Sequence, residues 1–591
     1  MEDYRREAEH FLTQETQFHL GMLPTEQSHP KTRGLAETLQ SDCQAGVRML
    51  QSVDEDVVAM AKRVFGGPEV EKLVTALSDA VLGGHRICFS GCGATGRLSI
   101  MLEAMWRKFW QGFARRQPAC TALAEKLADQ AESIMTGGDF ALVRSVEGFE
   151  DYISFGRQQA IEADLTAGDV LVAISEGGET SSVIGTLMEA RERGLETFFV
   201  FNNPADILSA HIERSRRVIE DPAVTVLDLA TGPMGVAGST RMQATTAELL
   251  VVGSALEQAL LRVLPKVLPA EALEALPSEL LKPIDGAAQF EALLRDLSSR
   301  EAVAAIASWV DTENELYAAG GRITYFAADC VLDIFTDTTE RTPTFMLPPF
   351  RKSDDLASPP SWAFVKDPVR PTPEAWRNVL GRAPRCLEWE TPLYESMGAS
   401  AKIINDPPRL GTEELMKFLI GSEADPSRTE VEPNVAMQVL LAQEVTSPEA
   451  AAWQEACRKA AAPFSRQMTV VIGLGETPEA AQVLQVPCRL TATPLGLWDR
   501  LAAKLVLNTV STATMGKFGR LVSNWMANVD TSNKKLVDRG TRLVAELTGL
   551  DYETACHELH RTFAEQKATA KPGQPRVSPV AKTVRRLGRK L

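Results

Sequence analysis

The sequence of 591 residues has no run of 18 apolar residues, so it predicts no transmembrane helix. Its first residues, MEDYRREAEHF, are charged and lack the apolar core of a signal peptide, so we expect a cytoplasmic protein. Basic residues are fewer than acidic residues, 62 against 78, and the formal net charge is −16. This balance excludes a protein built to coat nucleic acid or an anionic membrane, so an anionic ligand needs local groups to hold it.

Cysteine is scarce and scattered. The nine cysteines lie between Cys43 and Cys556, and an odd number of this kind is typical of a reducing compartment. Cys88 and Cys92 form the closest pair, but no second cluster completes the ligand set of a metal ion. The sequence therefore predicts no metal site and indicates that the thiols are buried or bystander groups.

What the sequence does contain is an ordinary globular composition, with 44% hydrophobic and 24% charged residues. Short apolar runs at 86–91, 169–175, 197–202 and 217–220 predict strands, and helical patterns lie between them. Strands that alternate with helices are typical of a doubly wound α/β fold with a parallel sheet.

A second copy of this pattern follows a proline-rich stretch at 262–285. GGRITYFAA (320–328) repeats GGHRICFSG (83–91), and further strands are expected at 468–475 and 488–492. We interpret the repetition as an internal duplication of one α/β domain with a period of about 235 residues.

The sequence therefore predicts five units along the chain. They are an N-terminal helical segment (1–40), a first α/β domain (41–275), a second α/β domain (286–505), a C-terminal helical cap (506–565) and a basic tail (566–591). The tail has eight Lys or Arg residues and no acidic residue, so we expect it to be disordered and solvated. The segment 350–373, rich in proline and aspartate, is expected to form loops.

Three turns rich in glycine and hydroxyl groups are candidates for binding an anion: GCGATG (91–96), SEGGETS (175–181) and TGPMGVAGSTRM (231–242). Glycine lets the backbone approach an anion, and the helix after each turn offers free N–H groups. The first turn matches the G-x-G-x-x-G pattern of dinucleotide sites, but two hydroxyl-bearing turns at one sheet edge suit a phosphosugar better. Each turn alone is also compatible with an ordinary connection between strand and helix. The predicted phosphosugar ligands are Gly93, Ala94, Thr95, Gly96, Ser175, Glu179, Thr180, Ser239 and Arg241.

These turns resemble those of the sugar isomerase (SIS) domain, in which an S-x-S-G-x-T turn holds a sugar phosphate. Further stretches resemble the family of N-acetylmuramic acid 6-phosphate etherase and glucokinase regulatory protein: LPTEQSHPKTRGL (23–35), SVEGFED (145–151), DTTERTPTF (337–345) and the long stretch 505–539. The resemblance covers most of residues 20–560. It implies two tandem SIS domains, each with a parallel sheet flanked by helices, and a C-terminal helical cap.

The resemblance also implies a pair of glutamates, one in a motif like D-A-S-E-C-P-P-T-F and one in a motif like E-G-A-E-D. The first half contains the second motif with Glu150, whereas the glutamate position of the first motif falls on Met105. The second half contains the first motif with Glu340. Such complementary losses predict one composite site between the two halves.

A lysine of the family is likewise kept in only one of the two halves. Its pattern, like A-Q-K-L-V-L-N, is present in the second half with Lys504, whereas the first half has Glu248 in the lysine place. We therefore expect Lys504 near the anionic groups of the ligand. Two residues depart from the SIS turn: Gly177 replaces a hydroxyl residue, and Glu176 brings negative charge near the expected phosphate.

The family resemblance implies a carbon–oxygen lyase. Its substrate would be N-acetylmuramic acid 6-phosphate, which loses a D-lactyl ether by elimination and hydration to give N-acetylglucosamine 6-phosphate and D-lactate. One carboxylate has to take the proton from C2, and another has to protonate the leaving oxygen. Glu150 and Glu340 fit these roles in either order, and the reaction needs no cofactor.

Two other functions stay open. Glucokinase regulatory protein, the animal member of this family, is a non-catalytic regulator that binds a phosphosugar and a sugar kinase. It keeps both glutamates as ligand contacts. An aldose–ketose isomerase would place a histidine at the site, and none of the seven histidines falls in the three turns. We expect a sugar 6-phosphate as the ligand in each case. A sugar kinase is an expected partner only of the regulator, and neither nucleic acid nor membrane is expected.

Overall fold

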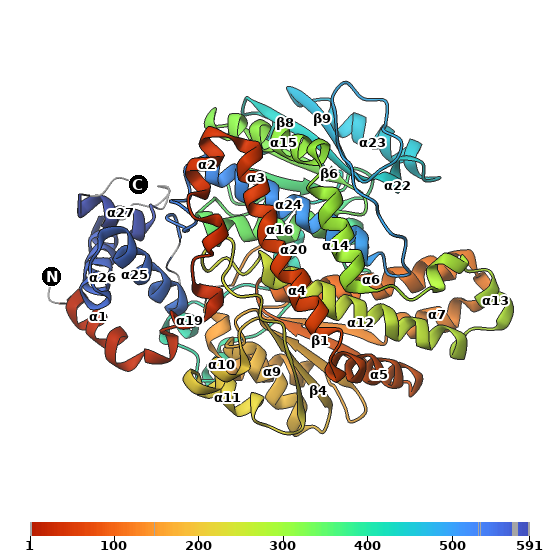
Figure 1. The fold of residues 1–591 in the computed structure, drawn as a ribbon, viewed down its shortest axis with the longest axis horizontal. Coiled ribbons are helices and arrows are strands. Elements are labelled where there is room, and N and C mark those ends of the chain that lie inside the picture. Colours follow the sequence, from red (N-terminus) through yellow and green to blue (C-terminus); the bar gives the residue numbers. More distant parts are fainter. Residues whose placement is uncertain (1–2, 147, 530, 532, 570–576, 589–591) are drawn as a thin grey trace.

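The computed structural model describes residues 3–146, 148–529, 531, 533–569 and 577–588. It contains two parallel sheets of five strands, one in each half of the chain, with helices packed around them (Figure 1). A bundle of helices that includes the end of the chain lies to one side of the sheets (Figure 1). The predicted α/β fold with two tandem domains and C-terminal helices is confirmed.

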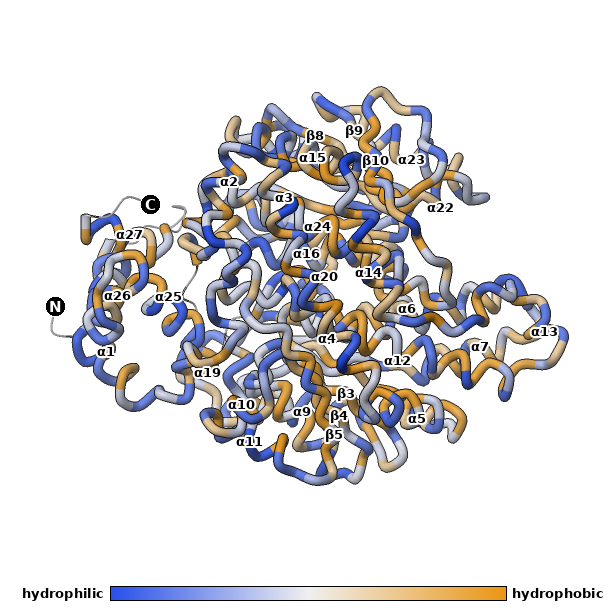
Figure 2. Tube along the Cα trace, viewed as in Figure 1, coloured by the Kyte–Doolittle hydropathy of each residue, from blue (hydrophilic) through white to orange (hydrophobic). Residues whose placement is uncertain are grey.

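The first sheet has the strand order β2-β1-β3-β4-β5, and all neighbouring strands are parallel. Its strands are β1 (Ile87–Gly91), β2 (Ala131–Met135), β3 (Val170–Ile174), β4 (Glu196–Phe201) and β5 (Val224–Asp228). β1 and β3 are buried along their whole length, and hydrophobic stretches of this sheet are orange in Figure 2. Because the strands are parallel, the turns that follow them meet at one edge of the sheet.

The second sheet has the strand order β7-β6-β8-β9-β10 and is also parallel. Its strands are β6 (Arg322–Ala327), β7 (Ala363–Lys366), β8 (Asn434–Leu441), β9 (Arg466–Ile472) and β10 (Val483–Val486). When β6 is matched to β1 and β7 to β2, the two sheets have the same strand order. The topology therefore repeats as the duplicated sequence pattern predicts.

Three local predictions are wrong. Residues 217–219 belong to helix α11 (Glu213–Ile219), and the fifth strand of the sheet follows it. Residues 488–492 lie beyond β10, which ends at Val486. The segment 350–373, predicted as loops, contains β7. In each case the apolar run is short, and its pattern alone does not distinguish a helix, a strand and a buried loop.

Helices surround both sheets. The N-terminal region contains α1 (Asp3–Gln14), α2 (Leu35–Ser41), α3 (Cys43–Gln51) and α4 (Glu55–Val64). The first half contains α5 (Pro68–Leu82), α6 (Ala94–Arg116), α7 (Thr121–Ala128), α8 (Ile153–Glu162), α9 (Ser181–Glu192), α10 (Ala205–His211), α11, α12 (Gln243–Val267) and α13 (Ala270–Glu274). The second half contains α14 (Gly286–Leu297), α15 (Arg300–Ala318), α16 (Val331–Phe345), α17 (Thr372–Leu380), α18 (Thr391–Ser396), α19 (Ala401–Asn405), α20 (Thr412–Met416), α21 (Pro426–Thr429), α22 (Ala442–Val445), α23 (Ala450–Ala461) and α24 (Leu497–Lys517). The C-terminal helices are α25 (Lys534–Thr548), α26 (Tyr552–Thr569) and α27 (Pro579–Arg586).

The two halves share one core. Helix α12 packs against α24, and α6 packs against α16, so helices of both halves meet between the sheets (Figure 1). The approach is close, because a Cβ atom on Gly253 of α12 would lie 2.5 Å from the side chain of Leu497. One continuous cluster of buried apolar side chains runs through both halves. Helix α24 therefore belongs to this core, and it crosses the domain boundary predicted at 505/506.

The cap consists of α1, α25, α26 and α27, which pack on one another. The prediction of a disordered tail is wrong for residues 577–588, because they include α27. Val580 and Val584 lie one turn apart and are fully buried, whereas Arg585 is exposed. The many basic residues of the tail obscure this short apolar stripe in the sequence. Tail residues 570–576 and 589–591 lie outside the described residues.

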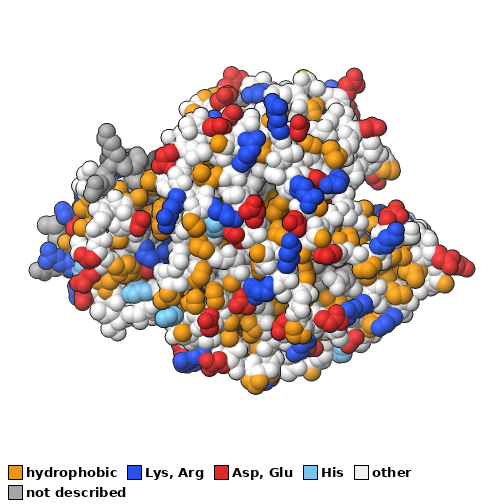
Figure 3. All heavy atoms as spheres, viewed as in Figure 1, with side chains coloured by type: hydrophobic (Ala, Val, Ile, Leu, Met, Phe, Trp, Pro, Cys, Tyr) orange, Lys and Arg blue, Asp and Glu red, His pale blue; other side chains and the backbone are white. Residues whose placement is uncertain are grey.

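The surface carries charges of both signs. On the face in Figure 3, Lys and Arg side chains are interspersed with Asp and Glu side chains. In the described ranges of the chain, no helix is both long and apolar enough to cross a bilayer.

Candidate functional site

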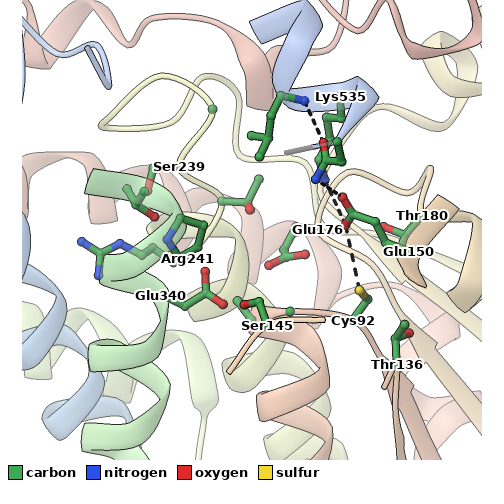
Figure 4. Close-up of a pocket in the computed structure, with 18 of the residues that line it drawn as sticks. Cys92, Thr136, Ser145, Glu150, Glu176, Thr180, Ser239, Arg241, Glu340 and Lys535 are labelled. Atoms are coloured by element: carbon green, nitrogen blue, oxygen red, sulfur yellow. Dashed lines mark hydrogen bonds and ion pairs between the residues drawn. The ribbon is translucent and has the colours of Figure 1, made fainter. Parts of the chain in front are cut away.

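A cavity of about 180 Å³ lies where three parts of the chain meet, and we call it the central pocket (Figure 4). The parts are the turns at the carboxyl edge of the first sheet, helix α16 of the second half and the start of the cap. The polar residues of its lining are Cys92, Arg97, Thr136, Ser145, Glu150, Glu176, Thr180, Ser239, Thr240, Arg241, Glu340, Thr344, Asn533, Lys535 and Arg539.

The first glycine-rich turn reaches the pocket through its backbone. Gly93 and Ala94 line the cavity at the start of α6, and Gly93 has φ +57°, a value that favours glycine. Thr95 does not line it, because its hydroxyl accepts the N–H of Cys92 at 3.0 Å and donates to the carbonyl of Cys92 at 2.8 Å. The hydroxyl of Thr95 therefore closes the turn, and its role as a ligand stays a prediction. Gly96 also lies outside the lining.

The second turn contributes Thr180, which was predicted, and Glu176 to the lining. Thr180 lines the pocket, but Ser175 is fully buried and donates a hydrogen bond to the Thr180 hydroxyl at 3.1 Å. Glu179 also lies outside the lining, with its Oε1 3.6 Å from Nζ of Lys535. Ser175 and Glu179 therefore support the turn from outside the described lining, and their roles as ligands stay predictions.

The third turn places Ser239 and Arg241 in the pocket wall. The Arg241 guanidinium is already engaged with the second half: it donates to Asp337 at 3.0 Å, Ser511 at 3.1 Å and Thr512 at 2.8 Å. Figure 4 shows it directed away from the carboxylates of the pocket. Arg241 therefore lines the pocket with its charge already paired to Asp337, and its role as a phosphate-binding cation stays a prediction.

The two glutamates predicted to act together, Glu150 and Glu340, line the same cavity from different halves of the chain (Figure 4). Glu150 lies in the short helical turn Phe149–Asp151, which Gly148 opens with φ +78°. Glu340 lies on α16, and a Cβ atom on Gly93 would be 3.9 Å from its Oε1. The glutamate of the second half therefore lies directly beside the glycine-rich turn of the first.

Each of these glutamates has its own polar partners. Glu340 forms an ion pair with the buried Arg97 of α6, which also donates to the carbonyls of Leu142 at 3.1 Å and Ala141 at 2.8 Å. Glu150 accepts a hydrogen bond from Asn533 of the cap at 2.6 Å. The cap is therefore part of the site, because it holds one of the two carboxylates.

Lys535, at the start of α25, is the lysine in the described lining. Its Nζ lies 3.8 Å from Glu150 and 3.6 Å from Glu179. Burial lowers the pKa of Lys535, but Glu150 and Glu179 outweigh burial, so the pKa is raised and the side chain is a cation. The long family-like stretch 505–539 contains this residue, but sequence analysis did not single it out.

Lys504 does not reach the central pocket. Its Nζ donates to the carbonyls of Arg241 at 3.1 Å and Met242 at 3.3 Å, and to the hydroxyl of Thr246 at 2.8 Å. It lines a separate cavity of about 50 Å³ behind Arg241. Burial lowers its pKa to about 8. Lys504 therefore links the third turn to α24, and its contact with a ligand stays a prediction.

A third carboxylate, Glu176, also lines the pocket and lies between Glu150 and Glu340 in Figure 4. Burial raises its pKa to about 7, and Glu340 and Glu179 add to the increase, whereas Lys535 opposes it. The sequence indicates the negative charge of Glu176 near the expected phosphate but does not indicate that it lines the pocket. Its position directly after β3, at the binding edge of the sheet, is the signal that could have identified it.

Parts of the chain are similar to known proteins. Residues 69–191 match the family model described as glucokinase regulatory protein N-terminal SIS domain. N-acetylmuramic acid 6-phosphate etherase from Enterobacter sp. (strain 638) is 30% identical over 233 residues, which are 39% of this chain and 68% of that protein. N-acetylmuramic acid 6-phosphate etherase 1 from Bacillus licheniformis is 26% identical over 236 residues, 40% of this chain and 67% of that protein.

Among solved structures, tagatose-6-phosphate ketose/aldose isomerase from Escherichia coli covers 78% of this chain and 92% of its own, with 10% identity and a TM-score of 0.37. The C-terminal domain of glucosamine-fructose-6-phosphate aminotransferase from Francisella tularensis covers 76% of this chain and 95% of its own, with 11% identity and a TM-score of 0.37.

The two sheets have the same strand order, and glycine-rich turns line the edge of the central pocket. These features define a protein with tandem SIS domains, a class that binds sugar phosphates. The chain belongs to the N-acetylmuramic acid 6-phosphate etherase and glucokinase regulatory protein family.

Proposed function

We propose that this protein is a carbon–oxygen lyase that releases D-lactate from N-acetylmuramic acid 6-phosphate. The observation that carries the proposal is the meeting of Glu150 and Glu340 in one pocket, although they belong to different halves. Elimination across C2 and C3 of the sugar needs a base and an acid on the same substrate, and two carboxylates in one cavity supply both.

In this proposal the open-chain sugar places its C2 proton beside one glutamate and its C3 ether oxygen beside the other. The base takes the C2 proton, which is acidic because it is alpha to the C1 aldehyde. The C3–O bond breaks, and the acid protonates the leaving lactate oxygen. Water then adds at C3, and a proton returns to C2, which gives N-acetylglucosamine 6-phosphate. Each carboxylate contributes a factor of about 10²–10⁴ to the rate.

The phosphate of the substrate is assigned to the turns. The backbone at Gly93 and Ala94 begins a helix of 23 residues, and such N-terminal N–H groups favour an anion. The hydroxyls of Thr180 and Ser239 line the same cavity, and Lys535 supplies a positive charge. Arg241 and Lys504 are engaged with other residues and are left out of this assignment.

Incubation of the purified protein with N-acetylmuramic acid 6-phosphate, followed by an assay for D-lactate, tests the proposal. We expect release of D-lactate and N-acetylglucosamine 6-phosphate in equal amounts. Binding of the sugar phosphate without release of D-lactate would contradict the lyase.

A second candidate is a non-catalytic regulator of a sugar kinase. Two observations favour it: the match of residues 69–191 to the regulatory protein's N-terminal domain, and the tandem layout. It would use the same pocket to bind a phosphosugar. The D-lactate assay separates the two functions, because the regulator binds the sugar phosphate and leaves it unchanged.

A further inference from the structure

A second and larger cavity adjoins the central pocket, and we call it the side cleft. Its volume is about 600 Å³, within the range of about 300–1,000 Å³ that is usual for small-molecule sites. The two cavities share four lining residues: Ser145, Val146, Gly148 and Asn533. A ligand bound in the central pocket can therefore extend into the side cleft.

The side cleft is formed by three segments that are distant in sequence. They are described residues between 140 and 152 of the first half, Lys352 and residues 400–410 of the second half, and the start of the cap. Figure 1 shows α19, which belongs to the second of these segments, beside α25 of the cap. The cleft is therefore composite in the same way as the central pocket.

The lining of the side cleft is basic. Five of its described residues are cations, Arg144, Lys352, Lys402, Arg409 and Lys534, and two are acids, Asp151 and Asp406. The whole chain has a net charge of −16, so this local excess of positive charge runs against the overall composition. A cleft lined by charge of one sign concentrates ligands of the opposite sign.

Two of these cations form no direct side-chain hydrogen bond or ion pair with a described residue. Lys352 pairs with Glu414 at 2.5 Å, and Lys534 pairs with Glu15 at 2.7 Å. Arg144 and Arg409, in contrast, have no such bond within the described ranges, although the charge of Arg144 helps to lower the pKa of Asp355. A guanidinium group binds carboxylate or phosphate oxygens with two parallel hydrogen bonds.

We propose that Arg144 and Arg409 bind an anionic extension of the same ligand whose sugar phosphate occupies the central pocket. This inference rests on the proposed function. The lactyl group is the point from which a muramic acid phosphate can be extended, through an amide at its carboxyl carbon. The substrate class is therefore an N-acetylmuramic acid 6-phosphate whose lactyl group carries a short peptide with free carboxylates.

The test compares two ligands by calorimetry: N-acetylmuramic acid 6-phosphate, and the same compound with an alanyl-isoglutamate dipeptide on its lactyl group. We expect wild-type protein to bind the dipeptide compound at least ten times more tightly. Arg144→Ala and Arg409→Ala should each weaken its binding by about ten- to a hundredfold, the usual effect of losing a charge-assisted hydrogen bond. The affinity for the unextended sugar phosphate should stay unchanged in both variants.

Arg466→Ala is the matched control, because Arg466 is exposed on β9, away from both cavities. It should change neither affinity. Equal binding of the two ligands by wild-type protein would overturn the inference, and so would an equal loss for both ligands in the arginine variants. If the free dipeptide binds as tightly as the attached one, the cleft is an independent anion site and the single-ligand proposal is wrong.

These outcomes are separate from the test of the lyase. If the protein releases no D-lactate but the dipeptide compound binds more tightly through Arg144 and Arg409, the proposed function fails and the second anion subsite stands. If D-lactate is released and the dipeptide gives no gain in affinity, the lyase stands and the subsite fails. If neither compound binds, both proposals are wrong.

Discussion

Glu340 of the second half forms an ion pair with Arg97 of the first half, and the Arg97 side chain is fully buried. This contact joins one of the two glutamates of the central pocket to helix α6, directly after the glycine-rich turn. It is therefore both a contact between the domains and a part of the site. Its loss should affect stability as well as chemistry.

We predict that Arg97→Ala lowers the free energy of unfolding by about 3–5 kcal/mol, because it leaves Glu340 without its counter-ion and the carbonyls of Ala141 and Leu142 without donors. Urea denaturation followed by circular dichroism measures the change. The double variant Arg97→Ala with Glu340→Gln should recover part of the loss. A single variant as stable as the wild type would contradict the role of this pair in joining the domains.

Lys535 should be important for affinity. Lys535→Met removes the described lysine of the central pocket, so we expect binding of N-acetylmuramic acid 6-phosphate to weaken by about ten- to a hundredfold. Lys534→Met is the matched control, because the neighbouring lysine pairs with Glu15 and lies outside the central pocket. Calorimetric titration of both variants measures the difference. Equal effects of the two substitutions would contradict the assignment.

Glu176 should make the protein sensitive to pH. Burial raises its pKa from an ordinary value near 4.5 to about 7 in the folded state, so the folded state holds more protons between these values. The contribution of this group to stability therefore falls as the pH rises from about 5 to 7. Glu176→Gln should raise the free energy of unfolding by about 1–3 kcal/mol at pH 8 and leave it nearly unchanged at pH 4.

The same carboxylate should repel a phosphate once it is ionised. We expect the affinity of wild-type protein for the sugar phosphate to fall between pH 6 and pH 8, and Glu176→Gln to reduce this fall. Titrations of both proteins at the two pH values provide the measurement, and the variant accounts for the ionisation of the phosphate itself. An identical pH dependence in both proteins would show that Glu176 does not face the phosphate.

The fold could be predicted well because its signals are local. β1, β3 and β4 are apolar runs that end in turns, and β6 repeats β1 after the proline-rich stretch. The composite site was predictable for a different reason: Glu150 and Glu340 each match only one of two family motifs. The two motifs together indicate that the glutamates share a site, whereas either motif alone does not indicate which part of the other half its glutamate contacts.

What the sequence does not predict about the site arises from tertiary contacts that a sequence pattern does not contain. Arg241 follows a glycine-rich turn, as a phosphate ligand would, but Asp337 of the other half already pairs with it. Lys504 matches a family lysine, yet its amine donates hydrogen bonds to the carbonyls of Arg241 and Met242. Lys535 reaches the pocket only because the cap folds back against the first sheet.

The two glutamates should affect chemistry far more than binding. Glu150→Gln and Glu340→Gln are expected to lower the rate of D-lactate release by at least about 10² while leaving the affinity for the sugar phosphate nearly unchanged. Glu220→Gln, at an exposed position after α11, is the control and should keep the full rate. Loss of binding in parallel with loss of rate would instead indicate that the glutamates serve only as ligand contacts.

The central claim is that the composite pocket performs an elimination followed by hydration, and the most direct measurement is the isotope content of the product formed in heavy water. N-acetylmuramic acid 6-phosphate is incubated with the protein in D₂O, and the N-acetylglucosamine 6-phosphate formed is analysed by NMR. We predict one deuterium at C2, because the base removes that proton and the solvent returns one. A product that keeps its C2 hydrogen, or the absence of any product, would contradict this account.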